Sequence, residues 1–553
     1  MRYRKGMSLL IALSLILLNV LIPVEIKAYG ENYDSKYIKV GLTSELSSKS
    51  TINLSGNSFS VVKGDNSFRE LLEINTGKIV AKSKNFGYHI QLSDNYYSYD
   101  SALSKANELK NLGIDASVAY DNGFRVWIGE FSDESSASTF MNSIVGLTSD
   151  YMEVSKNDSI VSIEETNGRK IISFDKNQNI CIKSTDNIIS VESKKYRDYI
   201  TFVNNNGKLI TINYIELGSY LKGVVPREMS GSWELEALKA QAVSARNFTL
   251  LSLNKHKDLG FDICDTTHCQ VYGGYNVEHP NSNRAVDETR DKVLKYNGEI
   301  ASTFYYSCSG GYTANNEDVW SGTPIPYLRA KEDIFSTNTP HSNWLYTITK
   351  QDASQALRSN GFDVGEIISI ETRRDSHGVR VVDFIVTGTK GSKTVSKEKV
   401  RAIFGYNNVK STNYVIDDSG STTPVDPGQT VDPSSNGEIY ILSQGSVYPT
   451  KSNIDNLSLI SRYTTEKINS NSMNIVVSDG KSYNTIAYNT NNNSSNSGTT
   501  NNSTSIVGDK ITFNGKGWGH GIGMSQYGAL NMAKAGYLYT DILEFYYTGA
   551  KVE

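Results

Sequence analysis

Residues 88–120 read "YHIQLSDNYYSYDSALSKANELKNLGIDASVAY" and carry the clearest fold signal in the chain. Apolar and polar side chains alternate over 88–92, which predicts a half-buried strand. Apolar residues then recur at helical spacing, and Gly113 follows them where a helix-ending glycine belongs. The residues "DASVAY" at 115–120 predict a second strand. The stretch therefore predicts a strand, a helix and a strand in succession.

The residues that follow repeat this order. A turn at "DNG" (121–123) leads into a third strand, "FRVWI", at 124–128. A second helix is predicted by apolar residues at helical spacing: Ala137, Phe140, Met141 and Ile144. We therefore expect a ferredoxin-like βαββαβ unit over 84–155, with helices on one face of its sheet. The other, exposed face would carry His89, Gln91, Tyr120 and Arg125 or their neighbours.

Both halves of this unit resemble the SPOR domain. The similarity rests on 88–120 and on "FRVWIGEFSDESSASTFMNSI" at 124–144. It implies binding to peptidoglycan glycan strands that have lost their stem peptides. A ferredoxin-like module with a purely structural role is the alternative.

The first 28 residues have the pattern of a signal peptide. Arg2, Arg4 and Lys5 precede an apolar stretch from Met7 to Val24, and "EIKA" ends at a small residue. Export to the cell wall or the medium follows if this segment is cleaved. An uncleaved membrane anchor is the alternative, because the apolar stretch is nearly long enough to span a bilayer.

Composition narrows the class of partner. The net charge is −4, which disfavours nucleic acid and anionic membranes. The 34 tyrosines suit carbohydrate, because aromatic rings stack on sugars, although exported proteins often have such compositions. Four cysteines in 553 residues do not make a disulfide scaffold.

The length predicts two to four domains in an α+β, multi-domain chain. Ser/Asn/Gly/Pro-rich stretches mark the linkers. The predicted order is a signal peptide (1–28), N-terminal strands of the main domain (37–80), the SPOR-like unit (84–155), the main domain (157–413), a linker (414–436), a small β-rich insertion (437–488), a second linker (489–505) and the end of the main domain (506–553).

Residues 224–246, "VVPREMSGSWELEALKAQAVSAR", place one carboxylate between a proline and a helix. Pro226 disfavours helix at Val225, so Glu228 is expected in a turn just ahead of the helix. Lys239 and Arg246 are seven residues apart, so they share one helix face and are expected to be reachable by a ligand. Taken alone, the stretch also fits an ordinary solvated helix with a loop glutamate.

Four blocks of sequence resemble the SpoIID/LytB family. They are "LKGVVPREMSGSWELEALKAQAVSARNFTL", "HKDLGFDICDTTHCQVYGG", "STFYYSCSGGYT" and "GKGWGHGIGMSQYGALNMAKAGYLYTDILEFYYTGAKV". That family includes a lytic transglycosylase of peptidoglycan and a protein described as an amidase enhancer. The resemblance implies that Glu228 is the key acid and that Lys239 and Arg246 bind substrate. The rival hypothesis is a non-catalytic glycan-binding protein that stimulates an amidase.

One carboxyl is enough for a lytic transglycosylase, whereas hydrolytic glycosidases usually need two. The acid protonates the glycosidic oxygen and then takes a proton from the muramic acid 6-hydroxyl, which closes a 1,6-anhydro ring. Such an acid needs a desolvated setting to stay partly protonated near neutral pH. The side chains expected to supply it are Val224, Val225, Pro226, Met229 and Trp233. Glycan strands already stripped by an amidase are the expected substrate.

A cysteine- and histidine-rich stretch places four metal-binding side chains within fourteen residues: His256, Cys264, His268 and Cys269. Two thiolates and two imidazoles complete a tetrahedral zinc shell, and some family members resemble zinc proteins here. A closed four-ligand site would be structural, so the chemistry itself needs no cofactor. A Cys264–Cys269 disulfide is the alternative.

The stretch "GKGWGHGIGMSQYGA" (515–529) has glycine at alternate positions, which permits positive φ or close backbone approach. The family resemblance places it opposite Glu228 in a glycan groove, with "YYSCSGGYT" (305–313) as a third wall. The side chains expected to line the groove are His520, Ser525, Gln526, Tyr527, Tyr306, Ser307 and Ser309. A Cys308–His520 nucleophile pair is disfavoured, because no third orienting residue is apparent.

Overall fold

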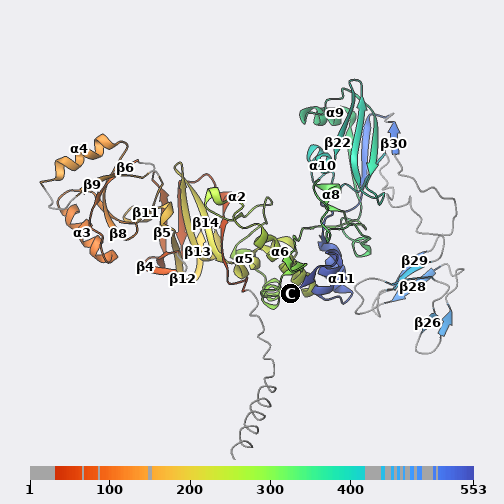
Figure 1. The fold of residues 1–553 in the computed structure, drawn as a ribbon, viewed down its shortest axis with the longest axis horizontal. Coiled ribbons are helices and arrows are strands. Elements are labelled where there is room, and N and C mark those ends of the chain that lie inside the picture. The colour runs from red at the N-terminus through yellow and green to blue at the C-terminus, as the bar shows by residue number, and fades with distance from the viewer. Residues whose placement is uncertain are drawn as a thin grey trace, which may run out of the picture.

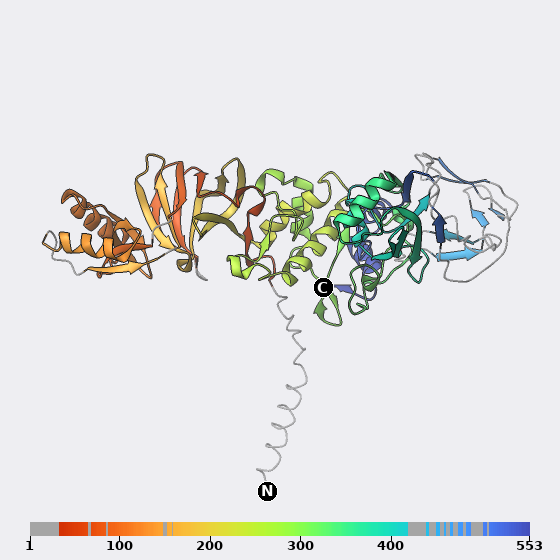
Figure 2. The same ribbon diagram turned by 90° about the horizontal axis from the view of Figure 1, so that it is seen from above.

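The computed structural model describes residues 32–417 and 508–553, apart from 65–67, 85–86, 147–151 and 158. Between 438 and 505 it describes only the backbone of seven short strands. The predicted signal peptide (1–28) and most of both predicted linkers lie outside the described residues. The fold is α+β and elongated, with the 88–156 unit at one end and the helices around α6 in the middle (Figures 1 and 2).

One 15-stranded sheet forms the N-terminal half of the molecule. Its central order is β1–β14–β13–β12–β2–β5–β10–β11, so the early strands pair with strands far along the chain. The strands predicted within 37–80 are confirmed as parts of it. Their bounds are β1 (Tyr37–Gly41), β2 (Thr51–Ser55), β3 (Phe59–Lys63), β4 (Arg69–Ile74), β5 (Lys78–Ser83), β10 (Ile160–Glu165), β11 (Lys170–Asp175), β12 (Ile180–Val191), β13 (Lys194–Asn205), β14 (Lys208–Glu216) and β15 (Ile263–Cys264).

The 88–156 unit has the predicted order of elements. Its neighbouring strands are antiparallel in the order β9–β6–β8–β7. Ser98 and Ser101 form a capping box at the start of α3, and Gly113 has φ of +80° just beyond its end. The elements are β6 (Tyr88–Leu92), α3 (Tyr99–Asn111), β7 (Ala116–Tyr120), β8 (Phe124–Phe131), α4 (Glu134–Ile144) and β9 (Met152–Lys156). Assignment of the unit to the SPOR family stays a prediction.

The expected exposed face of this unit is buried, so that part of the prediction is wrong. His89 and Gln91 are 1% and 8% exposed, and Tyr120 is 4% exposed. The Trp127 indole packs 4.0 Å from the His89 ring and donates a hydrogen bond of 2.8 Å to Gln91 Oε1. Arg125, the fourth residue of the prediction, is half-buried. Ala119 and Trp127 of this unit pack with Ile160 of β10, so side chains of the large sheet cover this face.

A layer of helices covers the end of the large sheet. Helix α6 contacts α5, α7, α11 and α12, so the C-terminal part of the chain returns to pack beside it. Figure 1 shows α11 next to α6, with the C-terminus nearby. The bounds are α2 (Thr43–Leu46), α5 (Leu217–Glu228), α6 (Leu235–Leu251), α7 (Pro280–Glu288), β16 (Leu294–Tyr296), β17 (Glu299–Ile300), β18 (Tyr305–Tyr306), α8 (Asn316–Val319), β32 (Met524–Ser525), α11 (Gln526–Lys534), α12 (Tyr539–Tyr546) and β33 (Lys551–Val552).

The region predicted as one main domain contains a second, separate hydrophobic core. Phe384, Phe513 and Tyr414 pack at its centre. Residues 414–417, predicted as the start of a linker, instead form a strand that pairs with 512–515. The elements are β19 (Trp344–Thr349), α9 (Lys350–Ser359), β20 (Ile367–Arg374), β21 (Val381–Gly388), β22 (Gly391–Ser396), α10 (Lys399–Phe404), β23 (Tyr414–Asp417) and β31 (Lys510–Gly515).

The remaining described strands lie in the predicted insertion and linker. They are β24 (Glu438–Ile441), β25 (Thr450–Asn453), β26 (Ser458–Ile460), β27 (Thr465–Lys467), β28 (Asn474–Ser478), β29 (Tyr483–Ala487) and β30 (Asn502–Ser505). Strand β30 pairs with β20 of the second core. Across the described part of the chain, no helix combines the length and the apolar character needed to cross a bilayer.

Candidate functional site

Glu228 is the last residue of helix α5. The prediction that Glu228 lies in a turn is therefore wrong. The helix continues through Pro226, and the Met229 amide donates to the Val225 carbonyl at 2.9 Å. Proline removes the amide donor to the Lys222 carbonyl, and the helix persists because its buried face outweighs that one lost hydrogen bond. Glu228 is therefore held at the rigid end of a helix whose other side chains are largely buried.

Three neutral donors surround the Glu228 carboxyl. They are the Gln526 side-chain amide, the Val271 backbone N–H and the Tyr305 hydroxyl. Burial raises the pKa of Glu228, whereas these hydrogen bonds and the nearby Arg227 guanidinium lower it. Burial is the largest effect, so the pKa of Glu228 lies above its ordinary value. The site thus disfavours the ionised form by desolvation while offering it three hydrogen bonds.

Two short strands bring distant parts of the chain to Glu228. Strand β18 pairs in parallel with β32, with Tyr305 opposite Met524 and Tyr306 opposite Ser525. Tyr305 and Gln526 are thereby placed at the same carboxyl. One residue of the glycine-rich 515–529 stretch and one of the 305–313 stretch thus contact Glu228, and the glycan groove expected between them stays a prediction.

The glycines of this loop serve packing within the protein. Gly519 and Gly521 have φ of +119° and +88°. A Cβ atom on Gly521 would lie 2.5 Å from the Arg380 guanidinium carbon, and one on Gly519 would lie 2.6 Å from Tyr306 Cβ. The prediction of positive φ is confirmed here, and the close approach is to the protein's own side chains.

The two cations on α6 are both paired with carboxylates. Lys239 forms ion pairs with Glu236 at 2.7 Å and Glu288 at 2.8 Å. Its ammonium also lies 5.8 Å from the centre of the Tyr539 ring. The carboxylates compensate its charge, although 14% of the side chain stays exposed. A substrate-binding role for Lys239 stays a prediction.

Arg246 is not reachable by a ligand, so that prediction is wrong. Its side chain is 0% exposed. The guanidinium makes a two-point contact with the Asp34 carboxylate, at 2.5 and 3.0 Å, and donates to the Lys292 carbonyl at 3.0 Å. Lys239 and Arg246 do share one helical face, but the N-terminal segment carrying Asp34 covers its far end.

Four of the predicted groove residues are also buried: Gln526, which is 8% exposed and donates to Glu228, and the three that follow. Ser309 is 0% exposed, and its carbonyl accepts from Arg380 at 3.1 Å. Ser525 is 0% exposed and caps α11 by accepting from the Gly528 amide at 3.1 Å. Tyr306 is 5% exposed. These buried side chains support the 305–313 and 515–529 stretches from inside the protein. We therefore do not expect them to contact substrate directly.

The His520 ring is neutral, and both of its nitrogens form hydrogen bonds with backbone groups of the protein. Nδ1 accepts from the Ile522 amide at 3.0 Å, so Nε2 carries the proton and donates to the Tyr305 carbonyl at 3.1 Å. Burial lowers the pKa of His520 to about 3. The Cys308 thiol instead contacts the Thr339 hydroxyl at 3.0 Å, and burial raises its pKa. Neither group has the partner that a cysteine-peptidase pair requires.

A row of partly exposed rings extends from the Glu228 site. Tyr527, next to Gln526, lies 5.0 Å from Trp233 and 5.6 Å from His341 between ring centres. His341 in turn lies 4.5 Å from Trp518. We call Trp233, Tyr527, His341 and Trp518 the aromatic row. Of the groove predicted from sequence, Ser307, Gln526 and Tyr527 remain at or beside the site.

The four predicted metal-binding side chains come together. One donor atom from each of His256, Cys264, His268 and Cys269 lies within 4.8 Å of all the others. His256 Nε2 is 3.3 Å from Cys269 Sγ, and His268 Nδ1 is 3.8 Å from Cys264 Sγ. All four cysteines of the chain are free thiols in the structure. The donor set and its spacing fit a tetrahedral zinc ion.

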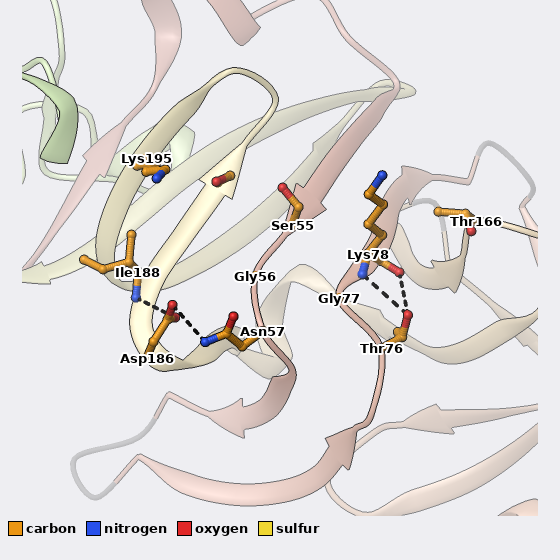
Figure 3. Close-up of a pocket in the computed structure, with 11 residues that line it drawn as sticks. Ser55, Gly56, Asn57, Thr76, Gly77, Lys78, Thr166, Asp186, Ile188 and Lys195 are labelled. Carbon is orange, nitrogen blue, oxygen red and sulfur yellow. Dashed lines mark hydrogen bonds between the residues drawn. The ribbon is translucent and has the colours of Figure 1, made fainter.

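A separate hollow of about 600 Å³ opens among strands β2, β5 and β12 (Figure 3). Its rim carries Lys78, Asp186 and Lys195, and Asn57 donates to Asp186 at 3.3 Å. None of its lining residues belongs to the Glu228 site, and its open, mixed-charge rim defines no chemistry. We therefore assign the candidate function to Glu228.

Comparison with known proteins supports this choice. Residues 205–296 match the family model SpoIID, described as "Stage II sporulation protein". The similarity to the SpoIID family model therefore lies in the segment that carries the candidate acid. The matched SpoIID segment contains Glu228, Lys239, Arg246 and the four metal-binding residues.

Individual relatives extend the similarity beyond the SpoIID segment. The "Amidase enhancer" of Bacillus subtilis (strain 168) is 34% identical over 330 residues, which are 60% of this chain and 39% of that protein. "Stage II sporulation protein D" of the same organism is 26% identical over 357 residues, covering 62% and 76% of the two chains. An uncharacterised protein of Brachyspira hyodysenteriae is 25% identical over 397 residues, which are 72% of this chain and 82% of that protein.

The sequence pattern missed several residues that build the site. Tyr305 contacts Glu228, whereas its neighbour Tyr306 was predicted to line the groove. Gln270 and Val271 were also missed, although they directly follow the predicted ligand Cys269. A two-residue strand gives no periodicity from which the facing tyrosine can be chosen.

Proposed function

We propose that this chain is an exported cell-wall enzyme, a peptidoglycan lytic transglycosylase that uses Glu228 as its acid and base. The observation that carries the proposal is the environment of that carboxyl. It is desolvated enough to hold a proton, and its hydrogen-bonding partners are neutral donors that also favour the carboxylate formed when the proton leaves. The match to the SpoIID family model and the similarity to "Stage II sporulation protein D" agree with a function in the cell wall.

The chemistry needs only this one carboxyl. Glu228 gives its proton to the oxygen that links muramic acid to glucosamine, and the bond from that oxygen to the muramic acid C1 breaks. The carboxylate then removes the proton from the muramic acid 6-hydroxyl, whose oxygen bonds to C1 and closes the 1,6-anhydro ring. The nucleophile belongs to the substrate, so proximity replaces a second protein carboxylate. Glu228 ends the cycle protonated again.

Glycan binding is proposed at the aromatic row. Trp233 follows Glu228 closely in the sequence, Tyr527 follows the Glu228 donor Gln526, and the two rings lie 5.0 Å apart. Flat rings of this kind stack on the apolar faces of pyranoses. Strands without stem peptides are the proposed substrate, because such strands are what the SPOR-like unit is expected to hold. An amidase acting earlier would supply them.

Zinc at the Cys/His cluster is proposed as a structural ion. The four side chains complete a shell, so no position remains for water or substrate. Thr266 supports the tight turn that adjacent ligands need, since its hydroxyl accepts from the His268 amide at 3.2 Å and its carbonyl accepts from the Cys269 amide at 3.0 Å.

A second function is favoured by one specific observation, the 34% identity to a protein named "Amidase enhancer". In that case the chain binds glycan without cutting it and stimulates an amidase. The relative is matched over only 39% of its length, so its name carries no more than this alternative.

The deciding experiment digests peptide-stripped glycan strands with the mature protein, Glu228→Gln and Glu234→Gln, and reads the products by mass spectrometry. Glu234 is an exposed glutamate six residues away, so its variant controls for a lost carboxylate. We expect fragments ending in 1,6-anhydro muramic acid from the wild type and from Glu234→Gln, and none from Glu228→Gln. Binding without new chain ends in any sample would establish the amidase-stimulating alternative instead.

A further inference from the structure

Gln270 links the Cys/His cluster to the Glu228 carboxyl. It follows Cys269 directly in the chain and is 2% exposed. Its Oε1 accepts from the Thr249 hydroxyl at 2.8 Å and the Tyr220 hydroxyl at 3.2 Å. Its Nε2 donates to the Tyr305 hydroxyl oxygen at 2.9 Å. Tyr305 is in turn one of the three donors to Glu228.

The direction of these hydrogen bonds is fixed by an obligate acceptor. Gln270 Nε2 lies 3.4 Å from the Ala245 carbonyl, which can only accept, so the amide nitrogen must face that side. The same nitrogen then donates to Tyr305. A tyrosine hydroxyl has a single proton, and with its oxygen accepting from Gln270 that proton is available to the two remaining neighbours of the hydroxyl, Glu228 and Gln241. The carboxylate is the stronger acceptor of the two, so the proton goes to Glu228.

We propose that Gln270 is a positioning residue that holds the Tyr305 hydroxyl proton on the Glu228 carboxyl. The inference rests on the proposed role of Glu228. Its consequence is that Tyr305 acts as a donor to the ionised Glu228 carboxylate. The carboxylate left after protonation of the glycosidic oxygen therefore meets a ready hydrogen bond, without any side chain having to rotate.

The Cys/His cluster takes part through the same segment. Residues 269–271 supply a cluster thiol, the Gln270 amide and the Val271 N–H that also donates to Glu228. Two of the three donors to the carboxyl thus depend on a segment whose first residue is a cluster ligand. This gives the cluster a role in the geometry of the acid as well as in folding.

The remaining groups that act on Glu228 are few. Arg227 is the nearby charged group that favours its ionised form, and Gln526 approaches from α11 as a neutral donor. Tyr305 and the adjacent Tyr220 have pKa values raised far by burial, so neither titrates in the working range. A change in the alkaline limb of the pH profile therefore reports Glu228.

The test is a double-mutant cycle of Gln270→Met and Tyr305→Phe, with kcat/KM for stripped strands measured across pH. Met has nearly the shape of Gln without its amide. Each single variant is expected to lower kcat by about 10²-fold, the usual cost of losing one donor to a developing charge. The alkaline limb should move to higher pH, because a carboxylate that loses a donor holds its proton more tightly. The double variant should match Tyr305→Phe, since Gln270 acts only through Tyr305.

Gln178→Met is the matched control, because Gln178 is a buried glutamine outside the Glu228 site, 6% exposed. It should leave the pH limb unmoved. Multiplying losses in the double variant, or an unmoved limb in Gln270→Met, would overturn the proposal and leave Gln270 with a packing role. If Gln270→Met does not fold, an unmoved limb in Tyr305→Phe overturns it equally.

A readout independent of catalysis separates this inference from the proposed function. The melting temperature of Tyr305→Phe and of Gln270→Met is followed from pH 4 to 9, with and without Glu228→Gln. If the hydrogen-bond direction is correct, both variants change the pH dependence only while Glu228 is present. That result supports the inference even if the wild type cuts no glycan. A pH effect that persists in the Glu228→Gln background refutes it.

Discussion

Replacing Arg246 by methionine is expected to destabilise the N-terminal half of the molecule, because the substitution strands a buried charge. Arg246 is 0% exposed and Asp34 is 3% exposed, and the two share hydrogen bonds of 2.5 and 3.0 Å. Removing one partner of such a pair costs about 3–5 kcal/mol. At about 2–4 °C per kcal/mol for a unit of this size, the melting temperature should fall by roughly 6–20 °C.

The double variant Arg246→Met/Asp34→Asn tests the cause. It leaves no unpaired charge, so most of the lost stability should return, to within about 1–2 kcal/mol of the wild type. Lys239→Met is the matched control, a cation on the same helix whose ion pairs are partly exposed, and its cost should stay below about 1 kcal/mol. Calorimetry measures all four proteins. If Arg246→Met melts like the wild type but no longer binds glycan strands, the argument from burial is refuted and Arg246 is a ligand-binding cation.

Three further predictions follow from the site. Burial raises the pKa of Glu228, so its ionisation lowers the stability of the fold as pH rises above the pKa that Glu228 has in the unfolded chain. Glu228→Gln should therefore melt at a higher temperature than the wild type at pH 8 and at the same temperature at pH 4. Equal melting temperatures at both pH values would contradict this. Burial lowers the pKa of His520 to about 3, so it should stabilise the fold above about pH 6.5 and lose that contribution as pH falls towards 3; a ring NMR titration midpoint near 6.5 would disprove it. Mass spectrometry of the purified protein should first find one zinc ion per chain, and finding no metal would contradict the zinc proposal. Removing the zinc with a chelator, or replacing Cys264 by serine, should then lower the melting temperature.

Structure could be predicted from the sequence where it depends on residues close together in the chain. The order of elements over 88–156 follows from period-two and helical spacing with a glycine at the helix end, so it was predictable. The Cys/His cluster was predictable for the same reason, because its ligands lie within fourteen residues and a tight turn is enough to gather them.

Local rules failed at Pro226 and at the sheet face of His89. Proline is a poor helix former on average, but in α5 the packing of the buried helix face outweighs the one lost N–H donor. His89 alternates correctly as a strand residue, yet alternation does not say whether a second layer will cover its face. Packing of Trp127 against His89 on one side and Ile160 of β10 on the other made that choice.

The sequence by itself therefore determined the order of strands and helices over 88–156 and which four side chains can hold a metal. Only the tertiary structure decided what surrounds them. Arg246 pairs with a residue 212 positions away, and Tyr305 reaches Glu228 through a strand pair formed with the C-terminal part of the chain. The reason is physical: spacing along a chain encodes contacts within a few turns, whereas burial and the choice of partner depend on long-range packing that the complete fold alone defines.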